Sequence, residues 1–194
     1  VNFRYNSGLT TKDVTTLQTN VLNAIEIYNN DTLEDFAGMF RYSQLLQTVN
    51  EADTSILSNI TTVKMYKLIT PTLSSALKYT LAFNNALYNP HSGHNMTGGG
   101  IISSTGFKIS DDDSVSEHFL DDNGSGVLRV YYLSGSTRVY TDTTYGTVDY
   151  ATGEVILTSA NITSISNVDG ATSTSIRVFV VPSSNDIVPV RNQV

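Results

Sequence analysis

The sequence predicts an α+β fold. An N-terminal α/β subdomain, with two helices packed on a small sheet, precedes a mainly antiparallel β subdomain. Apolar residues recur at helical spacing between Val14 and Val49, whereas the chain after Gly100 consists of short β-branched runs separated by glycine-containing turns. The glycine triplet at 98–100 separates the two patterns. We therefore predict an α+β subdomain at residues 1–97 (strand, two helices, two strands) and an antiparallel β subdomain at residues 98–194.

The predicted N-terminal elements start with a strand at residues 1–5 and a helix in which Thr10 with Asp13 resembles a capping box. That helix carries one apolar stripe, formed by Val14, Leu17, Val21, Ile25 and Tyr28. Thr32 with Asp35 offers a second helix start. The core side of that second helix is expected to hold Leu33, Phe36, Met39 or Phe40, Leu46 and Val49, with Gly38 as its weak point.

Two further strands are predicted at residues 60–69 and 78–88, with Pro71 in the connection between them. Later in the chain, a turn around Gly135 predicts a hairpin of residues 127–133 and 137–141, and a turn ending at Gly153 predicts a second hairpin of residues 147–150 and 154–158. This pattern of short strands joined by tight turns is typical of an antiparallel sheet, sandwich or small barrel.

A last strand is predicted at residues 175–181, where Pro182 stops it. Because side chains alternate along a strand, its two faces differ. One face carries Ile176, Val178 and Val180, and the other carries Arg177 and Phe179.

Composition excludes several classes of function. The 194 residues contain no cysteine, so neither a disulfide framework nor a thiolate metal site can form. The net charge of −7 lies entirely in residues 111–194, which disfavours binding to nucleic acid. No apolar run approaches the roughly 18 to 20 residues that span a bilayer, so we expect no membrane partner. The chain begins at Val1, and we interpret it as a piece of a longer polypeptide.

Candidate chemical sites are few. His91 and His94 lie close in sequence and His118 has acidic neighbours, but no known metal-ligand spacing is present. Residues 121–126 resemble the opening of a calcium loop, yet the twelfth position, where that loop needs an acid, is Tyr132. A polar turn is the favoured interpretation.

The acidic run at residues 111–113 is interpreted as a solvated loop. No nucleophile elbow, phosphate-binding loop or dinucleotide fingerprint occurs in the sequence. We therefore predict no catalytic, cofactor-binding or metal-binding residue, no cofactor and no small-molecule substrate. The protein is predicted not to be an enzyme.

Tyrosine is enriched, with eleven residues, and several lie in the predicted hairpins. Tyrosine is favoured at protein interfaces because it buries a large area with little loss of entropy. Cross-strand pairing within one sheet also favours it, so both explanations stay open. The candidate interface residues are Tyr131, Tyr140, Tyr145 and Tyr150.

Several segments, taken in order, resemble a known family. Residues 32–36, 40–46, 49–53 and 56–58 resemble the helix-then-strand region of baseplate wedge proteins from contractile-tailed bacteriophages, including the baseplate J-like group. Residues 146–157 and 185–192 resemble the carboxyl-terminal portion of the inner-ring wedge protein of T-even-like phages. The resemblance covers most of the chain.

This resemblance implies a structural protein of the virion, located in the tail baseplate and assembled in the host cytoplasm. Its implied partners are a second copy, in a homodimer formed by a carboxyl-terminal contact, and other baseplate wedge proteins. These contacts would link wedges into a ring. The alternative is a β-rich receptor- or carbohydrate-binding module of a tail or surface protein, which would present aromatic and polar groups in a concave site.

Overall fold

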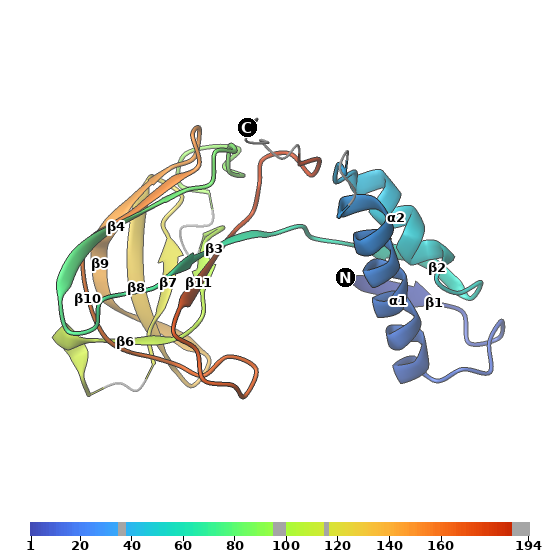
Figure 1. Cartoon of the computed structure of the whole chain (residues 1–194), viewed down its shortest axis with the longest axis horizontal. Coiled ribbons are helices and arrows are strands. Elements are labelled where there is room, and N and C mark those ends of the chain that lie inside the picture. The colour runs from blue at the N-terminus through green and yellow to red at the C-terminus, as the bar shows by residue number, and fades with distance from the viewer. Residues whose placement is uncertain (35–37, 95–99, 115–116, 188–194) are drawn as a thin grey trace. The chain divides into compact units, whose positions relative to one another are not determined.

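The computed structural model describes residues 1–34, 38–94, 100–114 and 117–187 (Figure 1). It divides into two compact units. Unit 1 comprises Val1–Val63 together with the segment that starts at Asn185, and unit 2 comprises Lys64–Ser184. The predicted boundary near Gly98 lies inside unit 2, because strands that precede it pair with strands near the end of the chain.

Unit 1 combines two helices with a two-stranded antiparallel sheet. Its elements are β1 (Asn2–Tyr5), α1 (Val14–Tyr28), the π-helical turn η1 (Asn29–Leu33), α2 (Tyr42–Glu51) and β2 (Ile56–Ile60). Helix α1 begins where the Asp13 carboxylate accepts a hydrogen bond from the Thr16 amide at 2.8 Å, so the N-cap is Asp13 and not Thr10. The core of the unit joins both helices to the sheet through Val21, Val49 and Ile56.

The second helix differs from its prediction. It begins at Tyr42, not near Leu33, because the chain first continues α1 as the turn η1. At Gly38 a side chain would lie 2.4 Å from the Leu33 carbonyl oxygen, so this close approach is compatible with glycine alone. Leu45 and Val49 are the buried residues of α2, and Met39 is exposed. Predicted core residue Phe36 lies outside the described residues.

Unit 2 contains two antiparallel sheets. The larger has the order β4-β10-β9-β8-β7, with β6 also paired to β10, and the smaller has the order β3-β11-β5. The larger sheet comprises β4 (Ala76–Ala82), β6 (Phe107–Ile109), β7 (Phe119–Asp122), β8 (Val127–Ser134), β9 (Thr137–Asp149) and β10 (Glu154–Ile165). The smaller sheet comprises β3 (Met65–Ile69), β5 (Ser103–Ser104) and β11 (Ile176–Val180). A 3-10 turn, η2 (Ser110–Asp112), follows β6.

One hydrophobic core lies between these sheets. It contains Ile176, Val178 and Val180 of β11 together with Leu128 of β8 and Leu157 of β10. The predicted α+β class, both predicted hairpins and the last strand are confirmed. Among the described residues, no helix is long and apolar enough to cross a membrane.

Two predicted strands were placed wrongly. The run 60–69 is split, since β2 ends at Ile60 and β3 starts at Met65 with a different partner strand. The run 78–88 forms β4 only as far as Ala82, after which Asn84 adopts a positive φ of 55°. That conformation interrupts a strand.

A substitution at Leu157 tests the hydrophobic core of unit 2. It is fully buried in β10, next to both β4 and β9. Leu157→Ala is expected to lower the free energy of unfolding by about 2 to 5 kcal/mol, through lost burial and the cavity left behind. Chemical denaturation measures this value. The control Leu133→Ala, at a half-exposed residue of β8, is expected to change stability by less than about 0.5 kcal/mol; equal effects would contradict the assigned core.

Candidate functional site

Two consecutive carboxylates, Asp121 and Asp122, are the most buried charged groups described, each 1% exposed. They end strand β7, and neighbouring residues on a strand point to opposite faces. Asp121 accepts hydrogen bonds from Arg129 Nε at 2.9 Å, from Arg138 Nη1 at 2.7 Å and from the Tyr140 hydroxyl at 2.8 Å. Two cations and a hydroxyl therefore compensate one buried charge.

Aromatic rings surround the Asp121 site. The Arg129 guanidinium lies 4.3 Å from the centre of the Tyr140 ring, and that of Arg138 lies 4.6 Å from the centre of the Tyr131 ring. These are cation–π distances. The two tyrosine rings are 5.9 Å apart. Burial, and then the hydrogen bond to Asp121, raise the pKa of Tyr140 above its ordinary value, so this hydroxyl remains a donor.

Asp122 accepts hydrogen bonds from other segments of the chain than Asp121 does. Its carboxylate accepts hydrogen bonds from the Ile102 amide at 2.8 Å, the Gly124 amide at 3.2 Å and the Tyr150 hydroxyl at 2.6 Å. A side chain at Gly100 would overlap this carboxylate, at 1.8 Å from Oδ1. Burial, followed by the hydrogen bond to Asp122, raises the pKa of Tyr150.

These contacts decide between the interpretations of residues 121–126. Both carboxylates are occupied by donors of the chain itself. The Asn123 side chain accepts hydrogen bonds from the Ser125 and Val127 amides, as in a tight turn. The segment is therefore a polar turn between β7 and β8.

The four candidate interface tyrosines are buried or partly buried. Tyr131 and Tyr145 are 8% and 5% exposed, and the Tyr140 and Tyr150 hydroxyls bind Asp121 and Asp122. Their role in an interface stays a prediction, and of the four only Tyr140 and Tyr150 are partly exposed.

His118 is fully buried, and neither ring nitrogen has a hydrogen-bond partner among the described residues. Nε2 lies 3.6 Å from an oxygen of Asp112, which is too long for a hydrogen bond. The Tyr132 ring lies edge-on at 6.0 Å. Burial lowers the pKa of His118, and Asp112 offsets this only partly. The imidazole is therefore neutral at pH 7.

The other histidines lie together. His94 Nδ1 and His91 Nε2 are 3.3 Å apart, and the His94 ring contacts Tyr88 with a centroid separation of 5.4 Å. Within the described ranges, no group of three or more histidine or acidic residues is arranged to hold a metal ion.

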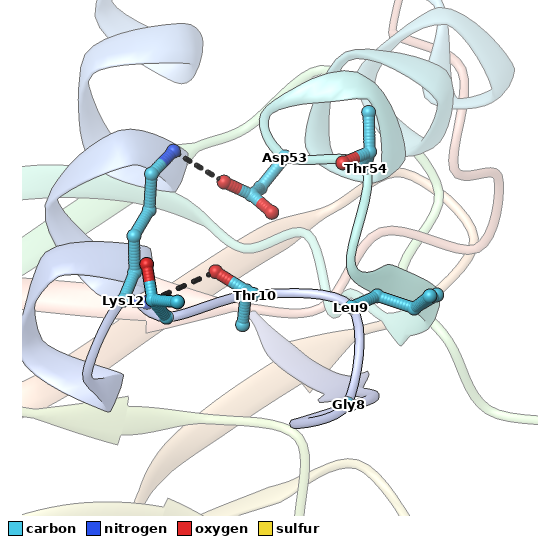
Figure 2. A pocket seen from close by; sticks show the side chains of 7 residues that line it. Gly8, Leu9, Thr10, Lys12, Asp53 and Thr54 are labelled. Atoms are coloured by element: carbon cyan, nitrogen blue, oxygen red, sulfur yellow. Dashed lines mark hydrogen bonds and ion pairs between the residues drawn. The ribbon is translucent and has the colours of Figure 1, made fainter.

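Unit 1 carries an open hollow of about 590 Å³ between the loop before α1 and the turn before β2 (Figure 2). Its charged groups bind each other, since Lys12 Nζ lies 2.6 Å from the Asp53 carboxylate. The hydrogen bond from Lys12, and then those from Ser55, hold the pKa of Asp53 far below its usual range. The pair anchors the loop to the turn, and the two charges of the hollow compensate each other.

A second hollow, of about 420 Å³, lies in unit 2 beside Asn89, Ser92 and Tyr150. The Tyr150 hydroxyl is bound to Asp122, and the Asp149 carboxylate accepts hydrogen bonds from the Ala151 and Thr152 amides. Its polar groups thus stabilise the chain's own turns.

Large apolar side chains are also exposed on the surface of each unit, where another chain could contact them. In unit 1 they are Val1, Leu9, Val14, Leu22, Ile27, Met39, Leu57 and Ile60. In unit 2 they are Tyr66, Leu68, Leu73, Leu77, Tyr88 and Leu133. Sequence reasoning missed Tyr66 and Leu68, because it assigned no partner strand to residues 65–69.

Comparison with known families matches residues 1–68 to the family described as "Baseplate structural protein gp6, C-terminal domain III". This range contains β1, both helices and β2. The resemblance to a baseplate structural protein is confirmed over these residues. No curated protein matches the sequence.

A substitution at Asp121 tests the hydrogen-bond network that surrounds this carboxylate. Asp121→Asn is expected to lower the free energy of unfolding of unit 2 by about 3 to 5 kcal/mol, because it leaves two arginines without their buried counter-charge. Urea denaturation measures the loss. Glu154→Gln, at an exposed acid of β10, is the matched control and should cost less than about 0.5 kcal/mol. A loss at Asp121 no larger than the control would contradict the network's role.

His118 makes stability depend on pH. Its folded pKa lies below the ordinary value of 6.5, so the unfolded chain takes up the proton first as pH falls. The stability that neutral His118 contributes is present above that value and is lost below it, by at most about 1.4 kcal/mol per pH unit. Denaturation between about pH 7.5 and 5.5 should show a smaller slope for His118→Phe. An unchanged slope in His118→Phe would refute the assignment.

Proposed function

We propose that this chain is a structural component of a phage tail baseplate, and that its surfaces form the subunit contacts that link wedges into a ring. The observation that carries the proposal is the match of residues 1–68 to the baseplate family. The matched residues include the hydrophobic core of unit 1, formed by Val21, Val49 and Ile56 with partly buried Phe3 and Ile25.

The proposed partners are a second copy of the chain and other baseplate wedge proteins. The proposed place of action is the baseplate of a contractile tail, assembled in the host cytoplasm. The internal contacts of the polar clusters stabilise the chain itself, which is compatible with a structural role. The carboxylates of Asp121, Asp122 and Asp53 are each bound by donors of the same chain.

The outer side of the β1–β2 sheet is the proposed contact of unit 1 with another wedge protein. On the inner side, the Asn59 amide donates hydrogen bonds to the Leu46 carbonyl and to Asn50 of α2. Ile60, one residue later, points to the opposite side, faces Asn2 across the ladder and is 76% exposed. An isoleucine so exposed gains by burial against a partner.

A receptor- or carbohydrate-binding module requires converging polar groups that are free to bind a ligand. The hollow beside Tyr150 does not favour it, since its Tyr150 and Asp149 groups are bound within the chain. We therefore propose no second function.

Co-purification with the neighbouring wedge proteins of the same phage tests the proposal. The wild-type chain is expected to bind at least one of them. Ile60→Lys is expected to weaken that binding by about tenfold or more, because a charge replaces a buried apolar contact. Leu22→Lys, at an exposed leucine of α1, is the matched control and should bind as wild type.

Two results would contradict these proposals separately. If the wild-type chain binds none of the neighbouring wedge proteins, the baseplate role is contradicted. If Leu22→Lys weakens binding while Ile60→Lys does not, the role stands and the assignment of the β1–β2 surface is wrong.

A further inference from the structure

The outer side of the β3–β11 strand pair carries a contiguous aromatic and aliphatic surface, which we call the β3–β11 outer face. The register places Tyr66 opposite Phe179 and Leu68 opposite Arg177, and directly opposed residues of an antiparallel pair point to the same side. The Tyr66 and Phe179 rings are 5.8 Å apart. The other side of β11 is buried in the core of unit 2.

This face is unusually apolar for an exposed sheet surface. Tyr66 and Leu68 are 58% and 55% exposed, and Phe179 beside them is partly exposed. Apolar residues scattered singly over a surface are ordinary, whereas adjoining ones mark contacts with other molecules. Tyrosine and arginine are also the residue types that contribute most to protein interfaces.

The free edge of β3 is a poorer contact than its outer face. Strand β3 ends the order β3-β11-β5, so one of its edges has no partner strand among those described. Its central residue, Lys67, is exposed and lies on the side opposite Tyr66 and Leu68. Symmetric pairing of two β3 strands about Lys67 would place like charges opposite each other, and edge lysines commonly prevent such pairing.

Charges beside the face indicate the partner. Arg177 and Asp169 have side chains that are 43% and 87% exposed, with 3.8 Å between Nη1 and Oδ2. An exposed ion pair this long contributes little to stability within one chain. In a dimer with two-fold symmetry, the cation of one copy can face the anion of the other copy, so this surface is complementary to itself. A partner surface that carried only positive or only negative charge would be repelled by either Arg177 or Asp169.

We propose that the β3–β11 outer face is the self-contact of a homodimer. Tyr66, Leu68 and Phe179 pack against the same residues of a second copy, and Arg177 of each copy pairs with Asp169 of the other. This inference rests on the homodimer of the proposed function and names its surface. Because the contact is isologous, every favourable pair occurs twice.

Sedimentation equilibrium of the whole chain over a concentration series tests the contact. The wild-type chain is expected to dimerise, and Leu68→Glu is expected to raise the dissociation constant by about tenfold or more. Leu133→Glu is the matched control, since Leu133 is exposed to a similar extent on β8, and it should dimerise as wild type. Circular dichroism confirms that each variant is folded.

Reversing the charge of Arg177 or of Asp169 tests the proposed homodimer contact more specifically. R177D and D169R each place like charges together in a symmetric dimer, so each alone is expected to be monomeric. A mixture of the two restores both ion pairs across the axis and is expected to form a heterodimer. A structural role within one chain predicts no such rescue by mixing.

The outcomes separate this surface from the proposed function. A wild-type dimer that Leu68→Glu leaves intact, or single charge variants that do not dimerise when mixed, would overturn the β3–β11 contact while the homodimer stands. A wild-type chain that stays monomeric at every concentration would overturn the homodimer itself, whereas binding to other wedge proteins would still support the baseplate role.

Discussion

The structure of unit 2 depends on the compensation of two adjacent buried charges, those of Asp121 and Asp122. A buried carboxylate is strongly destabilising unless donors surround it. Asp121 takes its donors from β8 and β9 through Arg129, Arg138 and Tyr140, and Asp122 takes its own from Ile102, Gly124 and Tyr150. The donors of Arg129, Arg138 and Tyr140 reach Asp121 only when β7, β8 and β9 pair in the observed register.

The two buried acids also engage polar side chains that could otherwise have contacted partners. The tyrosines of the β8–β9 region serve the buried acids or the core, and the charged groups of the unit 1 hollow serve each other. The exposed apolar side chains include residues of the sheets, namely Ile60 in unit 1 and Tyr66 and Leu68 in unit 2. Such surfaces suit a protein that is held in an assembly by packing.

The sequence predicted the features that depend on near neighbours. The stripe from Val14 to Tyr28 marks α1, and the turns at Gly135 and Gly153 mark both hairpins. It could not predict features set by distant pairing. The partner of Met65–Ile69 is Ile176–Val180, which moves the unit boundary away from Gly98. The burial of Tyr131 likewise depends on the register of three strands. The resemblance at residues 146–157 and 185–192 lies outside the matched range and stays a prediction.

The central proposal is that two copies of the chain associate through the β3–β11 outer face, whereas the sequence predicted a contact at the tyrosine-rich hairpins. Hydroxyl-radical footprinting at rising protein concentration reads the solvent access of single side chains and tests this claim most directly. The account predicts that Tyr66 and Phe179 lose reactivity as the chain associates, while Tyr140 and Tyr150 keep theirs. Loss of reactivity at Tyr140 and Tyr150, with Tyr66 unchanged, would contradict it.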